Sequence, residues 1–253
     1  MLPDQLLELL SSVQAGTTSP KDAQAALKDL PFADLGYASI DHHRALRQGV
    51  PEVIFGQGKT TDQIVGITQE LSRGGNNVLI TRLEATKADL VIRSLPGLRY
   101  AELARVATLE QEPIPPLGSH PVALVSAGTG DLPVAEECAE TLRMLGVACE
   151  RIYDVGVAGI HRLLGKRQKL ESCSVVIVVA GMEGALASAV GGLVQVPVIA
   201  VPTSVGYGAA LQGFTALACM LTSCASGVTV CNIDNGFGAA FATARILRAR
   251  DRY

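Results

Sequence analysis

Cys224 is the side chain of this sequence best suited to covalent chemistry. It lies in the polar stretch Thr222-Ser-Cys-Ala-Ser-Gly227, shortly before Asn232-Ile-Asp-Asn-Gly236. A free cysteine in a core packs as a small hydrophobe, whereas a thiolate in polar surroundings is a nucleophile. We therefore expect Cys224 to bond transiently to a substrate and expect the other five cysteines to be core residues. The six cysteines show no CxxC spacing, which argues against a disulfide framework and a structural zinc site.

The second half of the chain, which must position Cys224, alternates strand and helix patterns. Apolar runs at 121–126, 148–153, 174–180, 197–201 and 228–232 alternate with helical patterns near 133–145, 159–170, 183–192, 209–223 and 237–249. Such alternation is typical of a parallel sheet covered on both faces. The fold class we predict is α/β, with a C-terminal doubly wound parallel sheet of about five strands, a three-layer arrangement, after a small N-terminal α/β domain.

Polar residues and glycines gather at the ends of all five expected strands. Ligands bind outside the carboxyl ends of the strands in an open parallel sheet, so five such loops predict a substrate crevice. The residues expected to bind substrate are Ser126, Gly128, Thr129, Gly130 and Asp131 after the first strand, Asp154, His161 and Arg162 after the second, Met182 after the third, Thr203, Ser204, Val205, Gly206 and Tyr207 after the fourth, and Asn232, Asp234 and Asn235 after the fifth.

The loop after the first expected strand, Ser126–Asp131, resembles a turn that cradles phosphate. It is not the GxGxxG dinucleotide fingerprint, because only Gly128 and Gly130 are present. A tight turn that needs two glycines is the open alternative. His161 and Arg162 are expected to meet a phosphate or a carboxylate of the substrate, since the arginine fork can bind either in bidentate fashion.

A proline-rich segment at 110–119 separates the two halves of the chain, as an interdomain linker does. We place an N-terminal domain at residues 1–115 and a catalytic domain at 116–253. The elements expected in the first domain are helices at 4–14 and near 20–29, a strand at 51–56, a helix ending near residue 72, a strand at 77–81, a helix at 88–93 and a strand at 100–108.

Composition excludes several classes of protein. A net charge of −3 and a pI near 5.8 leave no basic surface for nucleic acid or anionic lipid. The N-terminus lacks a basic segment and a cleavage site of small residues, which indicates an amphipathic helix and not a signal peptide. The longest apolar stretch, 174–181, is too short to cross a bilayer. We therefore expect a cytoplasmic protein with no nucleic-acid partner and no membrane partner.

Several motifs of the chain match one known family. They are Ser126-Ala-Gly-Thr-Gly-Asp131, Val157-Ala-Gly-Ile-His-Arg162, Ala180-Gly-Met-Glu-Gly184, the runs 197–208 and 221–227, Asn232-Ile-Asp-Asn-Gly236, and, before the linker, Asp41-His-His-Arg44 and the run 51–60. With these motifs the chain resembles, over nearly its whole length, the LarB family of nicotinate dinucleotide carboxylase/hydrolases of nickel-pincer nucleotide synthesis. The second half is also similar, more distantly, to the PurE aminoimidazole ribonucleotide (AIR) carboxylases.

The resemblance implies a reaction on nicotinic acid adenine dinucleotide. CO2 would be added to C5 of the pyridine ring and the phosphoanhydride cleaved to release AMP, leaving pyridinium-3,5-biscarboxylate mononucleotide. A pyridinium carbon is electron-poor, so a thiolate must first add at C4 or C6 to make C5 nucleophilic, and we assign this role to Cys224. Glu183, whose apolar neighbours favour its uptake of a proton, is expected to accept the C5 proton. The open alternative for Glu183 is a solvated carboxylate that caps the next helix.

The position of Cys224 predicts a site shared between subunits. The expected helix 209–223, about 22 Å long, spans about the height of the sheet and carries Cys224 to the edge opposite its own crevice. The helix dipole there disfavours a thiolate, and no Lys or Arg lies within ten residues before it. We therefore expect a thiol that the cationic pyridinium activates on binding. The similarity to PurE enzymes, which form octamers with shared sites, implies a homo-oligomer, with an octamer expected.

Two basic residues of the first domain, Arg44 and Lys59, are expected to reach the adenylate end of the dinucleotide. The run Gly56–Thr60 lacks Walker spacing, so we do not interpret it as an ATP site. The adjacent histidines His42 and His43 point in different directions, which leaves a metal role and a surface or interface role both open.

A divalent cation generally assists phosphoanhydride cleavage, and the resemblance also implies one. Mg2+ is the expected cofactor because it prefers oxygen ligands. Asp131 and Asp234 are its candidate ligands.

Three functions compete for this sequence. The first is the LarB-like carboxylase/hydrolase. The second is a PurE-like carboxylase or mutase acting on AIR, which needs no nucleophilic cysteine. The third is a non-catalytic nucleotide-binding regulator, which would keep the glycine-rich loops without requiring Glu183 and Cys224 together. Cys224 with its flanking residues and the N-terminal domain favour the first.

Overall fold

The computed structural model describes residues 3–27 and 32–250, and the chain in it forms two compact units. The N-terminal unit extends to Tyr100 and includes Val106–Pro113. The C-terminal unit contains Ala101–Arg105 and the chain from Ile114 onward. None of the helices in the described ranges is long and apolar enough to cross a membrane.

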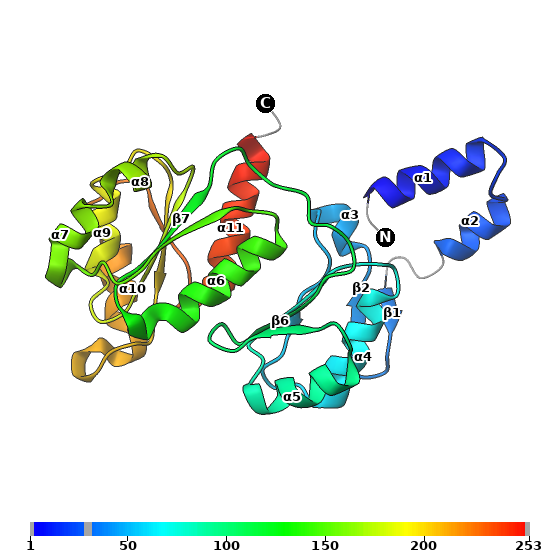
Figure 1. Cartoon of the computed structure of the whole chain (residues 1–253), viewed down its shortest axis with the longest axis horizontal. Coiled ribbons are helices and arrows are strands. Elements are labelled where there is room, and N and C mark those ends of the chain that lie inside the picture. Colours follow the sequence, from blue (N-terminus) through cyan, green and yellow to red (C-terminus); the bar gives the residue numbers. More distant parts are fainter. Residues whose placement is uncertain (1–2, 28–31, 251–253) are drawn as a thin grey trace. The chain divides into compact units, whose positions relative to one another are not determined.

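The N-terminal unit combines helices with a mixed sheet (Figure 1). A helical hairpin of α1 (Pro3–Gln14) and α2 (Pro20–Ala26) comes first, then the antiparallel pair β1 (Phe32–Asp34) and β2 (Ser39–Asp41), and helix α3 (Arg44–Gln48). The main sheet has the order β3-β4-β6-β5 and contains β3 (Ile54–Phe55), β4 (Val78–Thr81), β5 (Arg99–Ala101) and β6 (Val106–Leu109). Strand β3 is parallel to β4, and β6 is antiparallel to β4. Helices α4 (Thr61–Ser72) and α5 (Ala85–Ser94) pack on one another.

Helix α4 shows why this sequence folds as it does. Thr60 and Gln63 form a capping box that fixes its first turn. Ile64, Ile67 and Leu71 recur at helical spacing on its buried face and join a core with the wholly buried strand β4. Most of the stability of such a short helix therefore comes from its apolar face.

The first half of the sequence was the harder half to predict. The strand expected at 51–56 is reduced to Ile54–Phe55, and the single strand expected at 100–108 is two strands, β5 and β6, joined by a turn with Arg105 at φ 51°. The pair β1–β2 and helix α3 were not predicted, because three- and five-residue elements leave no periodic pattern. The end of the helix expected near 20–29 lies outside the described residues.

The C-terminal unit is a doubly wound parallel sheet, as the sequence predicts. Its strands are β7 (Val122–Ser126), β8 (Cys149–Ile152), β9 (Val176–Ala180), β10 (Val198–Pro202) and β11 (Val228–Val230), in the order β11-β10-β9-β7-β8. All pair in parallel. The strand order reverses between β7 and β9, which makes the carboxyl ends of these two strands the topological switch point of the sheet.

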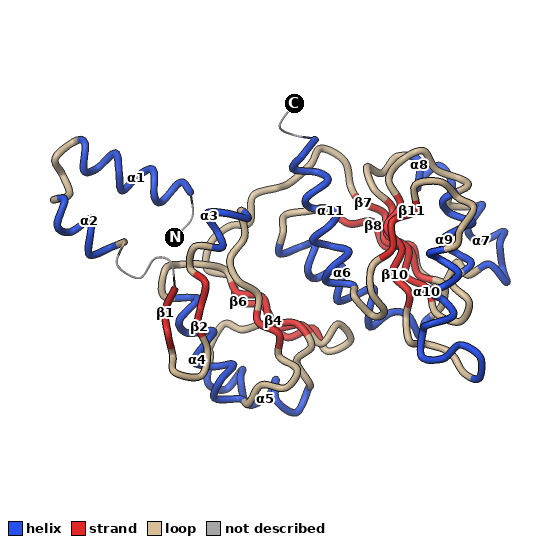
Figure 2. The backbone as a smooth tube through the Cα atoms, turned by 180° about the vertical axis from the view of Figure 1, so that it is seen from behind, coloured by secondary structure: helices blue, strands red, loops and turns tan. Residues whose placement is uncertain are grey.

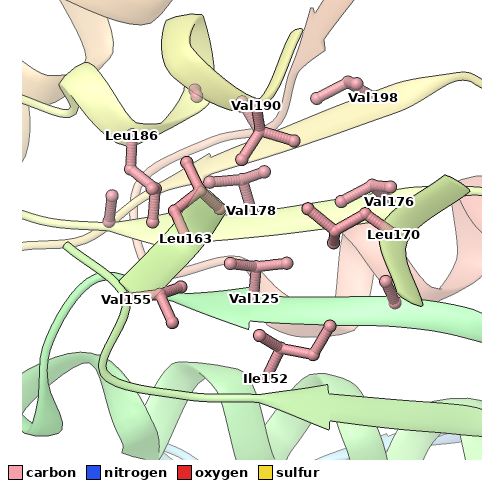
Figure 3. Packing of buried hydrophobic residues seen from close by; sticks show 14 of the residues in the cluster. Val125, Ile152, Val155, Leu163, Leu170, Val176, Val178, Leu186, Val190 and Val198 are labelled. Atoms are coloured by element: carbon pink, nitrogen blue, oxygen red, sulfur yellow. The ribbon is translucent and has the colours of Figure 1, made fainter. Parts of the chain in front are cut away.

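Two helical layers cover this sheet (Figure 2). Helices α6 (Leu132–Met144) and α11 (Gly236–Arg250) pack together on one face. On the other face lie α7 (Ile160–Leu164), α8 (Arg167–Glu171), α9 (Ala185–Gly191) and α10 (Phe214–Leu221). Figure 3 shows the core of this second face, where Val125, Val176, Val178 and Val198 of the strands meet Leu163, Leu170, Leu186 and Val190 of the helices. Alternate strand residues face the two layers, which is why every residue of β7, β9 and β10 is buried.

Two helices expected from the sequence are interrupted. The one expected at 159–170 ends at Gly165 and resumes as α8. The one expected at 209–223 is shorter than predicted, because Leu211 and Gln212 adopt left-handed φ angles of 47° and 52° and α10 begins only at Phe214. Gly213, at φ 94°, passes so close to the end of β10 that a Cβ there would lie 2.7 Å from the carbonyl oxygen of Thr203. The chain must therefore turn at this point before a helix can start.

A close contact between α6 and α11 holds the first face together. A Cβ on Gly236 would lie 2.2 Å from the carbonyl oxygen of Val134 in α6. The buried carboxylate of Glu137 accepts a hydrogen bond of 3.3 Å from the backbone N–H of Phe237, in the first turn of α11. The glycine permits the approach and the carboxylate caps the helix that makes it.

We predict that Gly236→Ala destabilises the protein by about 3 kcal/mol, because the added methyl group would clash with backbone that cannot move without shifting a helix. Urea unfolding followed by far-UV circular dichroism measures the change. Gly192→Ala is the matched control, since its Cβ would meet nothing closer than 3.6 Å and its φ of −78° is ordinary; we expect a change below about 0.5 kcal/mol. Equal stability of the two variants would contradict the proposed contact.

Candidate functional site

A cavity of about 320 Å³ opens at the carboxyl edge of the parallel sheet, at the switch point. The loops that follow β7, β8, β9 and β10 all contribute to its wall. The lining residues are Ala127, Gly128, Gly130, Asp131, Gly156, Val157, Ala158, Ala180, Gly181, Met182, Glu183, Ala185, Leu186 and Val205. A mostly apolar wall with few polar groups and a volume in the range of ligand pockets is what a small-molecule site requires.

The carboxylate of Asp131 connects the loops around this cavity. It is 3% exposed. One oxygen accepts a hydrogen bond of 2.6 Å from the Thr203 hydroxyl, after β10, and the other accepts one of 2.9 Å from the backbone N–H of Gly128, after β7. A backbone hydrogen bond from Gly181, after β9, adds a third link. Burial raises the pKa of Asp131 despite these donors, and the nearby charge of Asp234 also raises it.

Two glycines allow the loops to approach one another this closely. A Cβ on Gly181 would lie 2.4 Å from the carbonyl oxygen of Val205, and a Cβ on Gly156 would lie 2.8 Å from that of Ala127. Both contacts are with backbone, which cannot yield as a flexible side chain can. Any larger residue at either position would push one wall of the cavity outward.

Three non-glycine residues near the cavity adopt left-handed backbone conformations. Asp154, Met182 and Asp234 have φ angles of 57°, 55° and 56°, and each follows the end of a strand. Hydrogen bonds hold them in place: the N–H of Met182 donates to the carbonyl of Val205, and an oxygen of Asp234 accepts from the N–H of Ser204, each at 2.8 Å. Strained residues of this kind gather at functional sites.

The structure brings together six of the residues that the sequence predicts to bind substrate or act on it. Gly128, Gly130, Asp131, Met182, Glu183 and Val205 all line the cavity. Ser126 and Thr203 are fully buried behind it, and their hydroxyls bond to the N–H of Asp154 and to Asp131. These two hydroxyls hold the loops around the site together.

The other predicted residues after the five strands do not line the cavity in the single chain. They are Thr129, Asp154, His161, Arg162, Ser204, Gly206, Tyr207, Asn232, Asp234 and Asn235. Asn235 instead accepts a hydrogen bond of 2.8 Å from the N–H of Gly238, in the first turn of α11. Arg162 forms an ion pair of 2.6 Å with Asp154. Tyr207 is 82% exposed.

Sequence reasoning missed the apolar part of the wall. Val157 and Ala158 lie between the predicted Asp154 and His161, and Ala185 and Leu186 follow Glu183. Their signal in the sequence was weak, because small apolar residues are equally typical of a core. Gly156 was the best clue, since a glycine in a loop after a strand often marks a close approach of two backbones.

Glu183 lies in the cavity wall but is exposed. Apolar neighbours therefore do not enclose Glu183 in the single chain. Nor does it cap helix α9: the N-cap residue is Gly184, at φ 73°, and no side chain bonds to it. Glu183 is thus a carboxylate held at the cavity without a structural duty in its own helix.

Cys224 lies at the opposite edge of the sheet, as the sequence predicts. It follows the C-terminal end of α10 and precedes β11, and the neighbouring Ser223 hydroxyl lies 2.7 Å from that of Ser188 in α9. The thiol is exposed, whereas Cys138 and Cys173 are buried and the other three are partly buried. The cavity and Cys224 of one chain therefore lie at different ends of the strands.

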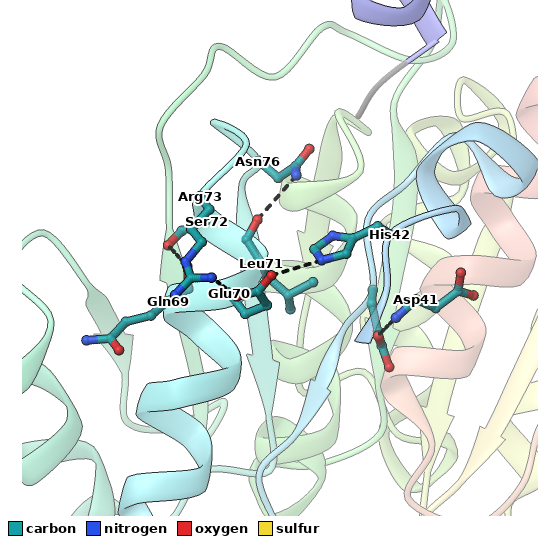
Figure 4. Close-up of polar contacts among 9 residues, drawn as sticks. Asp41, His42, Gln69, Glu70, Leu71, Ser72, Arg73 and Asn76 are labelled. Carbon is teal, nitrogen blue, oxygen red and sulfur yellow. Dashed lines mark hydrogen bonds and ion pairs between the residues drawn. The ribbon is translucent and has the colours of Figure 1, made fainter. Parts of the chain in front are cut away.

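The N-terminal unit contains the remaining candidates, and most of them have local partners. The Lys59 ammonium donates to the carbonyl of Phe55 at 3.0 Å. His42 bonds through Nε2 to the buried Glu70 carboxylate at 3.2 Å (Figure 4), whereas His43 contacts Arg47 at 3.3 Å. The two histidines therefore point to different partners.

Arg44, the second basic candidate of that unit, has a buried Nε with no hydrogen-bond partner among the residues that the structure describes.

The donor set does not fit a resident metal ion. Within the described ranges, no three His, Cys, Asp or Glu side chains are grouped so that they could hold one. The oxygens of Asp131 already accept hydrogen bonds from Thr203 and Gly128, and one oxygen of Asp234 accepts from Ser204. These carboxylate oxygens are therefore already engaged by donors of the protein itself.

Each half of the chain matches a known protein family. Residues 32–111 match the model of the LarB/PurE-like N-terminal domain, and residues 121–253 match that of AIR carboxylase. An uncharacterized protein of Methanocaldococcus jannaschii is 42% identical over 242 residues, which cover 92% of this chain and 93% of that protein. A crystal structure of a PurE2 variant of Treponema denticola is similar with a TM-score of 0.45 and 22% identity, over 53% of this chain and 84% of that one.

The family matches lie in the two halves in which the sequence motifs were found. The AIR carboxylase match alone spans more than half of the chain and contains the whole cavity. The chain therefore belongs to the AIR carboxylase family, in the LarB/PurE-like form that carries this N-terminal domain.

Proposed function

We propose that this protein converts nicotinic acid adenine dinucleotide and CO2 into pyridinium-3,5-biscarboxylate mononucleotide and AMP, as a step of nickel-pincer nucleotide synthesis. The observation that carries the proposal is the switch-point cavity with Asp131 and Glu183 in its wall, in a chain that joins a LarB/PurE-like N-terminal domain to an AIR carboxylase domain. The exposed Cys224 supplies the nucleophile that this reaction needs.

The ring chemistry begins with the Cys224 sulfur. The thiolate lone pair forms a C–S bond at C4 or C6 of the pyridinium, and the displaced ring π electrons move onto the ring nitrogen, which leaves a dihydropyridine whose enamine is nucleophilic at C5. Carbon C5 then attacks CO2. Glu183 takes the C5 proton, the C–S bond breaks, and the ring regains its aromaticity and positive charge while the thiolate leaves. Water cleaves the phosphoanhydride in a separate step that releases AMP.

A second copy of the chain must bring Cys224 to the cavity, because within one chain the two lie at opposite edges of the sheet. The surface around α10 supports such an assembly. Four large apolar side chains there are exposed to solvent: Tyr207 (82%), Leu211 (63%), Phe214 (64%) and Leu221 (66%). Large apolar side chains gathered in this way mark an interaction surface. We propose a closed homo-oligomer, an octamer, with sites shared between subunits.

In this proposal Mg2+ arrives with the substrate phosphates and is not held by the protein beforehand.

Arg44 and Lys59 of the N-terminal unit are proposed to contact the adenylate end of the dinucleotide, since a basic side chain suits a phosphate.

A second candidate, an AIR carboxylase or mutase, is favoured by the family match over residues 121–253. It would use the same cavity but has no use for a nucleophilic thiol. The substrate assay below therefore separates the two candidates.

We predict that the purified protein, given nicotinic acid adenine dinucleotide, bicarbonate and Mg2+, releases AMP and a product 44 mass units heavier than nicotinate mononucleotide. Mass spectrometry detects both. Cys224→Ala should lower carboxylation by a factor of about 1,000 or more, because the variant lacks the sulfur whose addition makes C5 nucleophilic. Added EDTA should slow AMP release. Conversion of AIR with no reaction of the dinucleotide would instead support the second candidate.

Sharing of the site predicts complementation between two inactive variants. Chains carrying Cys224→Ala and chains carrying Glu183→Gln, co-expressed with different tags and purified as mixed oligomers, should recover about a quarter of wild-type activity, since a random quarter of sites would combine both native residues. Each variant alone serves as the control. Mixed oligomers as inactive as either parent would show that both residues come from one chain.

We predict that iodoacetamide labels Cys224 slowly in the free protein and faster with a bound pyridinium nucleotide, whose charge favours the thiolate. The other thiols provide an internal reference. Burial raises the pKa of Cys138, Cys173 and Cys231, and raises that of Cys149 to about 12. These thiols should therefore stay unlabelled at neutral pH. Peptide mapping by mass spectrometry measures the sites, and rapid labelling of Cys224 without ligand would contradict activation by substrate.

A further inference from the structure

The ion pair between Asp154 and Arg162 brackets the segment that forms one wall of the cavity. Asp154 precedes and Arg162 follows the lining residues Gly156, Val157 and Ala158. The distance between Nη1 of Arg162 and Oδ2 of Asp154 is 2.6 Å. The two side chains therefore close a loop whose middle faces the cavity.

The backbone of Asp154 is held by hydrogen bonds to the end of β7. The N–H of Asp154 donates to the Ser126 hydroxyl at 3.3 Å, and the N–H groups of Val155 and Gly156 donate to the carbonyls of Ser126 and Ala127 at 3.1 and 2.9 Å. Asp154 itself sits at φ 57°, a conformation that Asp and Asn tolerate better than other side chains. The end of β7 thus fixes the backbone that carries this carboxylate.

The arginine side of the pair is held less firmly. The guanidinium folds back over Gly159, where a Cβ would lie 2.7 Å from Nε. Its side chain is 40% exposed and that of Asp154 is 57% exposed. Within the described residues, this guanidinium pairs with Asp154 through Nη1. The remaining donors of the fork can still take up a second oxygen.

We propose that Asp154 is a positioning residue whose carboxylate stands in for an oxyanion of the substrate on Arg162. It keeps the guanidinium folded over Gly159 while the site is empty, and the substrate oxyanion displaces it. An exposed ion pair with one contact contributes little, whereas an oxyanion that binds the fork in bidentate fashion gains two charge-assisted hydrogen bonds. The inference rests on the proposed function for the identity of the substrate.

The Asp154 carboxylate must be displaced before a substrate oxyanion can bind Arg162, so it lowers the affinity for the substrate. This effect on affinity can be measured. Asp154 competes with the ligand for the same guanidinium donors. Asp154→Asn removes the charge while keeping the shape and the tolerance of a left-handed φ. We expect this variant to bind nicotinate mononucleotide about fivefold more tightly at low ionic strength, because the ligand no longer has to displace an exposed ion pair, whose contribution is at most of this order. The gain should shrink at 0.5 M salt.

Isothermal titration calorimetry on the full-length protein measures these affinities. Glu150→Gln is the matched control, because it removes one negative charge from another exposed ion pair, with Lys169, and should leave affinity unchanged. The gain from Asp154→Asn should disappear in the Arg162→Gln background, since the effect acts through the guanidinium. A gain that persists there would show simple charge repulsion and overturn the positioning role.

Three ligands identify the oxyanion. Nicotinamide mononucleotide carries the phosphate alone, nicotinic acid riboside carries the carboxylate alone, and nicotinate mononucleotide carries both. If Asp154→Asn binds nicotinamide mononucleotide more tightly, Arg162 contacts the phosphate. If it binds nicotinic acid riboside more tightly, Arg162 contacts the carboxylate. If the wild type binds the pyridine nucleotides and Asp154→Asn binds them no more tightly, the proposed role of Asp154 is contradicted. The proposed function is then unaffected. If the wild type binds none of them, the proposed function fails and the stand-in fails with it.

Discussion

The buried carboxylate of Asp131 is the interaction on which the rest of the candidate site depends. It accepts hydrogen bonds from groups that follow β7, β9 and β10, and so it joins three loops that are far apart in the sequence. Burial works against its ionised form, which raises its pKa, and the surrounding donors offset part of that cost. The glycines Gly156 and Gly181 matter for the same reason, because they let the joined loops close into one wall.

The parallel sheet separates the two reactive side chains of the proposed mechanism. Every strand of the C-terminal unit runs in the same direction, so loops after strands gather at one edge and loops before strands gather at the other. Glu183 belongs to the first group and Cys224 to the second. The proposed chemistry therefore requires assembly of several chains. In such an assembly the apolar side chains exposed near α10 would form part of the interface.

The polar residues at the carboxyl edge of the sheet have different structural roles. Thr203 and Ser126 are buried and hold the loops, while Glu183 is exposed in the wall and has no such task. Asp154 and Arg162 occupy each other in the free chain. A polar residue at the end of a strand can therefore either hold the loops together or face the cavity.

The sequence by itself determined the C-terminal fold and the edge at which the cavity lies, because continuous apolar strands alternating with helices permit few other arrangements. It also placed Cys224 at the far edge, although α10 is only Phe214–Leu221. Only the tertiary structure decided which polar residues face the cavity, since that depends on partners distant in the chain, as with Asp131 and Thr203. The short elements β1, β2 and α3 were likewise beyond prediction, because contacts and not local periodicity hold such elements in place.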